Sequence, residues 1–174
     1  QPTYAYERCT AMTFPIIVGL GEGSVVGVLA QKAFHVSPFT FAVIMASGTF
    51  ANITSMGWTR VSLAKSKIPF VTMLMVLSIL LTAAIGLLPL NPTGGLLLAV
   101  LIITIRCLLA GFVTLRSILW RQNYPRSLRA KITGKFSILA GTIIGVIPLM
   151  AYALLDKNIE SFRIISPFGA LVSG

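Results

Sequence analysis

The sequence predicts an all-α integral membrane protein, a helical bundle of five complete transmembrane helices plus the start of a sixth. Hydrophobic residues make up 56% of the 174 residues and charged residues only 10%, whereas soluble domains carry about 25% charged residues. The mean hydropathy is +0.91. Because four acidic residues are too few to cover a surface in water, we expect the lipid bilayer to surround most of this chain.

The predicted helices follow from apolar runs that are long enough to cross a membrane. A helix needs about 20 apolar residues to span a hydrocarbon core of about 30 Å. The runs that meet this length are 10–31, 36–59, 68–90, 96–115 and 136–155. A sixth run begins near Ile164. We treat residues 1–174 as one transmembrane domain, and we expect the native chain to continue past both ends, since it starts with Gln1 and stops at Gly174 inside an apolar run.

Each predicted span has its own sequence character. The first is interrupted only by Glu22, and the second has no charged residue. Turn-forming residues end the third span at Asn91 and Pro92. The fourth contains a single charge, Arg106, and the fifth is uncharged and has a candidate kink at Pro148. The five spans are therefore expected to differ in their charged, turn-forming and kink-forming residues.

The positions of Lys and Arg predict the orientation, because cytoplasmic loops carry an excess of these residues. With the N-terminus inside, ten of the 14 basic residues fall in cytoplasmic segments and three in outer segments. We therefore expect a cytoplasmic N-terminus and cytoplasmic basic loops, the longest of them between the fourth and fifth spans, over residues 116–135. Short basic clusters between apolar runs also argue against nucleic acid as a partner.

Two charges lie within the predicted spans, Glu22 and Arg106. Each lies about ten to twelve residues into its span, which places both near mid-membrane. A charge there is costly unless it is paired or hydrated. Three interpretations are open: Glu22 binds a proton or cation and Arg106 an anionic group of a substrate; the two form a structural pair; or they face a cavity without a direct role.

Glycines at four-residue spacing predict close helix contacts. They are Gly19, Gly23 and Gly27 in the first span and Gly141 and Gly145 in the fifth. With one His, four acidic residues and two Cys in the chain, no Ser–His–Asp set, carboxylate pair or metal cluster is evident. We therefore expect no enzyme activity, no metal and no cofactor.

The segment that joins the second and third spans contains a partial signature. Gly57 and Lys65 match a pattern of a glycine, an acid–base pair, a second glycine and a basic cluster. Ala64 stands in place of the second glycine, and Val61 and Ser62 in place of the acid–base pair. On this segment and its topology, the chain resembles the N-terminal half of a major facilitator superfamily transporter.

The segment between the fourth and fifth spans resembles the same family. Tyr124 and Pro125 precede Arg126, much as a Tyr-Pro or similar pair precedes an arginine in many bacterial members. Arg106 also lies where numerous members carry an arginine. The resemblance covers nearly the whole chain. It implies one six-helix half, partnered by a C-terminal six-helix half in the same or another chain, in a bacterial inner membrane.

The resemblance further implies transport of a small solute, with a coupling proton or cation, by alternating access. Glu22 and Arg106 would then face the central cavity. The implied cytoplasmic gating residues are Gly57, Arg60, Lys65, Lys67, Arg121, Arg126 and Arg129. The alternative function is that of a non-transporting membrane scaffold or partner-binding subunit.

Overall fold

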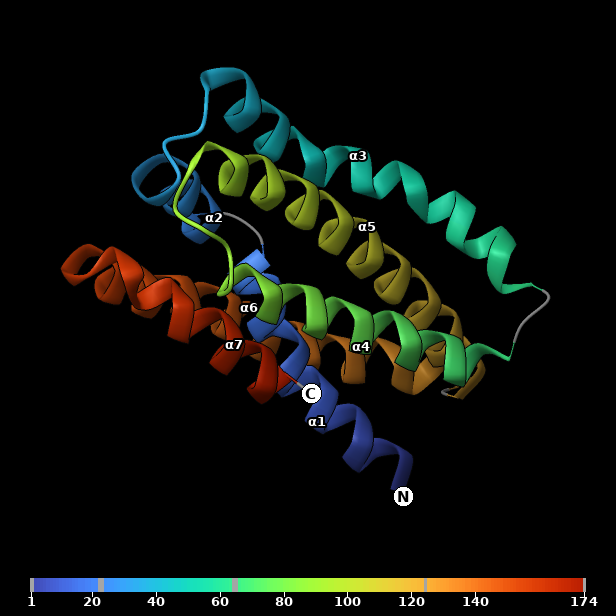
Figure 1. The fold of residues 1–174 in the computed structure, drawn as a ribbon. Coiled ribbons are helices and arrows are strands. Elements are labelled where there is room, and N and C mark those ends of the chain that lie inside the picture. Colours follow the sequence, from blue (N-terminus) through green and yellow to red (C-terminus); the bar gives the residue numbers. More distant parts are fainter. Residues whose placement is uncertain (1, 22–23, 64–65, 124, 174) are drawn as a thin grey trace.

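The computed structural model of the chain describes residues 2–21, 24–63, 66–123 and 125–173, without the side chains of residues 2–9, 122, 123, 126, 128 and 129. The described ranges are helical almost throughout and contain no β-strand (Figure 1). The elements are α1 (Pro2–Gly21), α2 (Ser24–Val28), the π-helix η1 (Leu29–Ala33), α3 (Pro38–Ser62), α4 (Lys67–Ile85), α5 (Pro92–Asn123), α6 (Arg126–Lys157), the 3₁₀-helix η2 (Ile159–Ser161) and α7 (Phe162–Ser173).

Five of these helical segments are long and apolar enough to cross a membrane. They cover Thr10–Ala33, Pro38–Ser62, Lys67–Ile85, Pro92–Arg121 and Ala130–Lys157. The expectation of an all-helical chain with five spans is therefore confirmed. We call α1, α2 and η1 together the first span.

The expectation of a long basic loop between the fourth and fifth spans is wrong. α5 continues to Asn123 and α6 begins at Arg126, with Pro125 as its N-cap. Residues 116–123 contain neither Pro nor Gly, so nothing in this stretch stops the helix. The basic residues therefore lie within α5 and α6, and Pro125 stands at the N-cap of α6, where its missing N–H costs no helical hydrogen bond.

Side-chain caps start α3 and α5 at the same end of the bundle. The backbone N–H of Thr40 donates to Ser37 Oγ at 3.1 Å, and that of Gly94 donates to Asn91 Oδ1 at 2.7 Å. Each cap is followed by a proline at the first helical position, the arrangement that favours a helix start. Gly94 has to be glycine, since a Cβ would lie 1.8 Å from the Pro89 carbonyl oxygen.

The helices pack in a symmetric pattern of neighbours. α3 lies against α5 and the first span against α6; α4 packs on α5 and α7 on the first span; and α4 and α7 contact each other (Figure 1). In this set of contacts the first span corresponds to α5, α3 corresponds to α6, and α4 corresponds to α7. Each contact has an equivalent under this correspondence: α3 with α5 matches α6 with the first span, and α4 with α5 matches α7 with the first span. The largest contacts among the described helices thus relate two three-helix units, the first span with α3 and α4 and α5 with α6 and α7.

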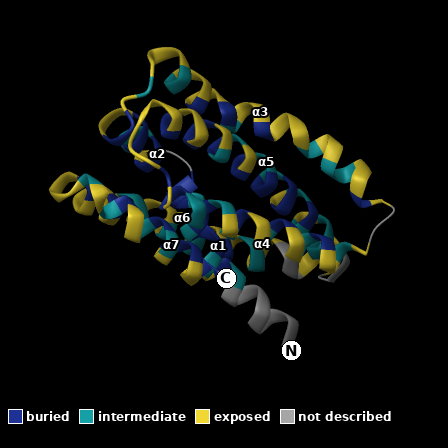
Figure 2. Ribbon diagram, in the orientation of Figure 1, coloured by how far each residue is buried: buried dark blue, intermediate teal, exposed yellow. Residues whose placement is uncertain are grey.

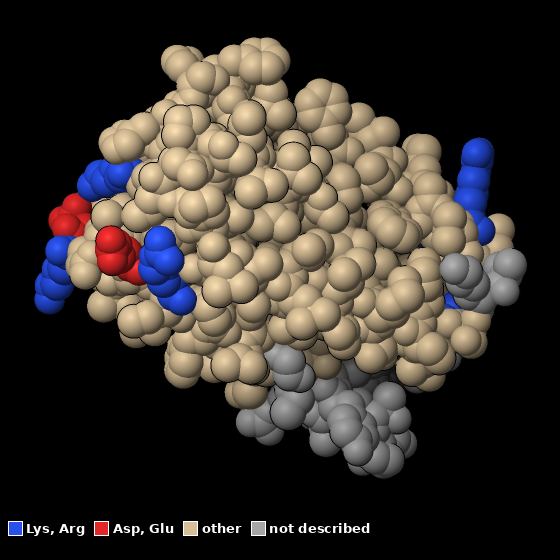
Figure 3. Space-filling model, viewed as in Figure 1, with Lys and Arg blue, Asp and Glu red and all other residues tan. Residues whose placement is uncertain are grey.

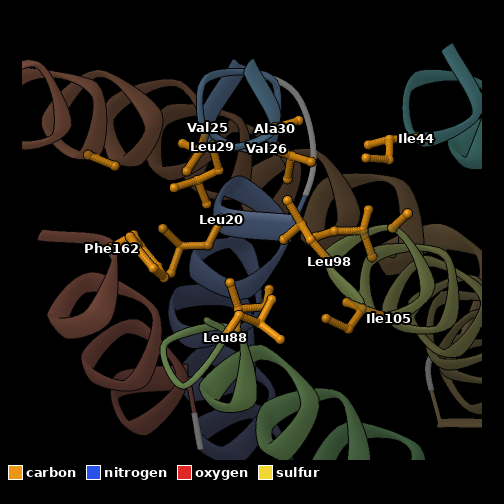
Figure 4. Packing of buried hydrophobic residues seen from close by; sticks show 14 of the residues in the cluster. Leu20, Val25, Val26, Leu29, Ala30, Ile44, Leu88, Leu98, Ile105 and Phe162 are labelled. Atoms are coloured by element: carbon orange, nitrogen blue, oxygen red, sulfur yellow. The ribbon is translucent and has the colours of Figure 1, made fainter. Parts of the chain in front are cut away.

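The first span and α5 form the centre of the bundle. Their apolar segments are 62% and 50% buried, against 17% for α3 and 11% for α6, and Figure 2 shows α3 largely exposed beside the buried α5. In the core, Leu20 and Val26 of the first span, Ile105 of α5 and Phe162 of α7 belong to one cluster of buried side chains (Figure 4). α3 and α6 are therefore the outlying helices of this chain.

Charged side chains gather at the two ends of the bundle. We call one end the basic end; its described bases include Arg60, Lys67, Arg121, Lys131 and Lys135. The opposite, mixed-charge end holds Lys32, Asp156, Lys157, Glu160 and Arg163. On the face shown in Figure 3, acidic atoms occur at one end only, and uncharged surface separates the two ends. This separation is what a bundle crossing a membrane requires.

Candidate functional site

Arg106 forms the polar centre of the bundle. Its side chain projects from α5 and is only 4% exposed. Its Nε donates to the Gly21 carbonyl oxygen at 3.3 Å, and its Nη1 donates to Ser47 Oγ at 2.7 Å and to the Ile44 carbonyl oxygen. The Ser47 hydroxyl in turn donates to the same Ile44 carbonyl at 2.7 Å. One guanidinium thus joins the first span, α3 and α5.

Glu22, the other charge expected within the spans and one of the proposed partners of Arg106, lies outside the described residues, and so does Gly23. Gly21, next to Glu22 in the sequence, contacts the guanidinium directly. The first span and α5 are therefore neighbours at this depth. Pairing of Glu22 with Arg106, and a coupling role for Glu22, stay predictions.

A cavity of about 790 Å³ adjoins Arg106. This volume lies within the range of sites that hold small molecules, about 300–1,000 Å³. Apolar side chains of the first span and α5 make one part of its wall, and its polar lining consists of Thr49, Asn52, Ser55, Arg106 and Thr114. Among the described residues, the lining thus offers hydroxyl groups, one amide and the Arg106 guanidinium for hydrogen bonds.

The polar wall on α3 is a feature that the sequence reasoning missed. Thr49, Asn52 and Ser55 are spaced three residues apart, so they lie on one face of the helix. Thr49 and Asn52 are exposed in this chain although they belong to a membrane-spanning segment. A carboxamide facing hydrocarbon is costly, so this face borders water or protein. The three-residue spacing in an otherwise apolar run was the signal available.

The predicted gating residues that the structure describes lie at the basic end. Arg60 is exposed in the last turn of α3, Lys67 is half-buried at the start of α4, and Arg121 is exposed in the last turn of α5. A Cβ on Gly57 would meet nothing within 4 Å. Of the others, Lys65 and the side chains of Arg126 and Arg129 lie outside what the structure describes.

The glycines predicted to pack helices differ in their surroundings. A Cβ on Gly19 would lie 3.5 Å from Ile147 and Pro148 of α6, and one on Gly27 would lie 3.7 Å from Met45, both ordinary contact distances. A Cβ on Gly141 or Gly145 would meet nothing within 4 Å. Among the residues that the structure describes, the last two glycines therefore mediate no close helix contact.

The tightest glycine contact between α3 and α5 was not predicted. A Cβ on Gly111 would lie 2.9 Å from the indole ring of Trp58. The Trp58 Nε1–H donates to the Cys107 carbonyl oxygen, one turn away on the same helix, at 2.9 Å. Gly111 thus makes room for a tryptophan that is held by a hydrogen bond, and the ring fixes the separation of the two helices.

Comparison with known proteins yields no matching family model, no similar curated protein and no similar solved structure. Among the described residues, no three His, Cys, Asp or Glu side chains lie together as metal ligands would. The functional argument therefore depends on the geometry around Arg106 and on the arrangement of the helices.

Proposed function

We propose that this chain is the N-terminal half of a secondary transporter of the major facilitator type, which moves a small polar solute by alternating access. The cavity beside Arg106 is the observation that carries the proposal, because it provides a polar wall within helices that are otherwise apolar. Transporters of this kind bind their solute near the bilayer midplane, between helical repeats. Its basic end faces the cytoplasm of a bacterial cell, as the excess of Lys and Arg favours.

The symmetric contacts of the two three-helix units support the proposal. Each six-helix half of a major facilitator transporter contains two such units with inverted topology. Here α3 and α6 take equivalent places, against α5 and the first span respectively. The same exchange relates α4 to α7 and the first span to α5. A scaffold protein has no need of such a repeat.

The outlying helices support a second six-helix half, in the same or another chain, as the partner. α3 exposes Thr49 and Asn52, and α6 exposes Gly141 and Gly145 with open space beside them. Polar side chains and glycines favour helix–helix contact over contact with lipid. A second bundle placed against α3 and α6 covers both faces and closes the cavity.

Arg106 has two roles in the proposed transporter. Its hydrogen bonds to Gly21 and Ser47 fix the helices that carry the cavity wall, and its charge lies at that wall, where it attracts an anionic group on the solute. Glu22 is the proposed site of the coupling proton or cation. The cytoplasmic gating role of the basic-end residues belongs to the same proposal.

Cysteine labelling in membrane vesicles of the complete native protein tests the proposal. Cys9 and Cys107 are first replaced by Ser, and Asn52→Cys is then compared with Ile53→Cys, the adjacent residue, which is 66% exposed but does not line the cavity. A charged, membrane-impermeant thiol reagent is expected to modify Asn52→Cys at least about tenfold faster, because a thiol reacts as the thiolate, which needs water.

The side of labelling separates a transporter from a scaffold. In alternating access, Asn52→Cys reacts in both inside-out and right-side-out vesicles. Reaction from one side only, or equal slow reaction of Asn52→Cys and Ile53→Cys, contradicts the proposal. The Ser replacement at Cys107 keeps the backbone carbonyl that Trp58 uses, so the background variant retains this contact.

A further inference from the structure

A second cavity lies between the basic end and the cavity beside Arg106, which we call the polar cavity. It encloses about 210 Å³ and is bordered by α1, α5 and α6. On α5 it is lined within residues 113–120 and the polar cavity within residues 106–114, so the second cavity is the nearer of the two to the basic end. It has room for several water molecules, each of which takes about 30 Å³ in the liquid. This cavity therefore leads from the basic end toward the polar cavity.

Three apolar side chains form the boundary between the two cavities. Phe14 of α1, Val113 of α5 and Ile144 of α6 border both of them, so each of three helices contributes one side chain. An apolar constriction excludes water and polar solutes when it is narrow, because water makes no hydrogen bonds to its walls. The boundary thus lies on the path from the basic end to the hydroxyl and amide groups of α3.

Phe14 is the buried member of this boundary. It is 8% exposed, whereas Val113 and Ile144 are 51% and 37% exposed. Its ring stacks on the ring of Phe112, with 4.6 Å between the ring centres, which is within the range that aromatic pairs prefer, about 4.5–7 Å. The stacking holds the Phe14 ring against α5, across the inner side of the boundary.

The helix next to Phe14 contains a residue that favours bending. Pro15 follows Phe14 in the interior of α1. A proline has no N–H, so Pro15 cannot donate to the carbonyl of Ala11, one turn earlier. Sharp bends in helices occur mainly at such positions. A bend of α1 at Pro15 moves the Phe14 ring relative to the other two side chains and breaks no hydrogen bond from residue 15.

We propose that Phe14 is a gate residue that, with Val113 and Ile144, closes the polar cavity to the basic end. In the structure the Phe14 ring separates the two cavities. When α1 bends at Pro15, the ring leaves the boundary, the cavities join, and water and polar solutes pass between the basic end and α3.

This gate rests on the polar cavity of the proposed transporter and adds a barrier inside the bundle. It is distinct from the gating residues expected at the basic end, since Arg60, Lys67 and Arg121 lie at the helix ends. Those residues are charged, whereas the boundary is apolar. The two barriers are therefore separable by substitution.

Labelling of Asn52→Cys in membrane vesicles of the complete native protein tests the gate. Cys9 and Cys107 are replaced by Ser, and the charged, impermeant thiol reagent is applied to one side of the membrane at a time. Lys135→Cys, exposed at the basic end, identifies the side that this end faces. Phe14→Ala is expected to speed the labelling of Asn52→Cys from that side at least about fivefold, because loss of the ring joins the two cavities. Labelling from the other side should not change.

Leu20→Ala is the matched control. Leu20 is an equally buried residue of the first span, 6% exposed, and does not line either cavity. An equal acceleration by Leu20→Ala would mean that truncation of any core side chain loosens the bundle, and it overturns the proposal. An unchanged rate in Phe14→Ala overturns it as well.

Ile144→Trp tests the boundary in the opposite direction, and it decides if Phe14→Ala does not fold. Ile144 is exposed among the described residues, so a larger side chain is compatible with folding there. It narrows the boundary, and labelling of Asn52→Cys from the basic side is expected to slow at least about threefold. An unchanged rate overturns the gate.

Failure of the gate and failure of the proposed transporter give different results. If Asn52→Cys reacts no faster than Ile53→Cys in every variant, the polar cavity holds no water, and both proposals are wrong. If Asn52→Cys reacts fast from both sides and neither Phe14→Ala nor Ile144→Trp changes its rate, the transporter stands and the gate is wrong.

Discussion

The contact between α3 and α5 differs from the equivalent contact between the first span and α6. The first has buried polar groups at mid-helix, where Arg106 donates to Ser47 at 2.7 Å, and a tryptophan ring that sits against Gly111. The second has an ordinary glycine contact at Gly19, 3.5 Å from Ile147. It also has an ion pair at its end, Lys32 with Asp156, 3.0 Å apart, whose side chains are 51% and 58% exposed.

The same helix arrangement is thus stabilised by different interactions in its two halves. A guanidinium buried among helices has few alternatives to its protein partners, whereas an exposed ammonium group can exchange a carboxylate for water at little cost. We therefore expect substitutions in the α3–α5 contact to affect stability far more than substitutions between the first span and α6.

Removal of the Arg106 side chain is expected to have the largest effect. Arg106→Met keeps the length and deletes the hydrogen bonds to Gly21, Ile44 and Ser47. Hydrogen bonds to charged groups are worth about 1.5–3 kcal/mol each, and bonds between membrane helices average less. The expected loss is about 2–4 kcal/mol in the free energy of unfolding, measured by denaturation in mixed micelles.

Ser47→Ala is the graded control for this prediction. It removes one hydroxyl that links Arg106 to the Ile44 carbonyl, and it should cost about 1 kcal/mol. A stability for Arg106→Met equal to that of the unaltered chain would show that the guanidinium does not hold the three helices together.

A methyl group at Gly111 is expected to have the next largest effect. The Cβ of Gly111→Ala would lie 2.9 Å from the Trp58 ring, so the ring or a helix has to move. Overpacking of this kind costs about 1–3 kcal/mol. Gly19→Ala is the matched control in the equivalent contact, since its Cβ meets α6 at 3.5 Å. The helix propensity of alanine should leave that variant as stable as the unaltered chain or slightly more stable. Equal destabilisation of both variants, measured by the same denaturation, would contradict the proposed asymmetry.

The number of spans could be predicted from the sequence, because long apolar runs of adequate length have few other structures. The ends of α5 and α6 could not. Arg116 and Arg121 end the apolar run of α5, but the helix continues through polar residues to Asn123, and α6 begins directly after Pro125. The hydrophobicity of a segment indicates whether lipid or water surrounds it. Where its helix ends depends instead on residues that disfavour the helical backbone, such as proline and glycine.

The candidate site could be predicted only in part for a related reason. Arg106 was identified because a charge within an apolar run is rare, and Asn52 was not, because an uncharged polar residue changes the average of its run very little. The contact of Gly111 with Trp58 depends on which helices are neighbours. The four-residue spacing of Gly141 and Gly145 predicted a close helix contact, but both glycines face open space among the described residues. Spacing shows that two residues share a helix face; it does not show which helix lies opposite that face.

Loss of the ion pair between Lys32 and Asp156 is expected to have the smallest effect. Both side chains are more than half exposed, and Lys32 also lies 5.6 Å from the ring of Tyr152, which remains as a partner. Lys32→Gln, Asp156→Asn and the double variant form a cycle whose coupling energy should be close to zero at physiological salt, and slightly larger at low salt because screening weakens. Denaturation midpoints of the four proteins at two salt concentrations measure it. A coupling energy as large as the cost of Arg106→Met would contradict this expectation. It would mean that the ion pair fixes the ends of the first span and α6 as firmly as Arg106 fixes α3 and α5 at mid-helix. The two contacts would then differ in where they are stabilised and not in how strongly.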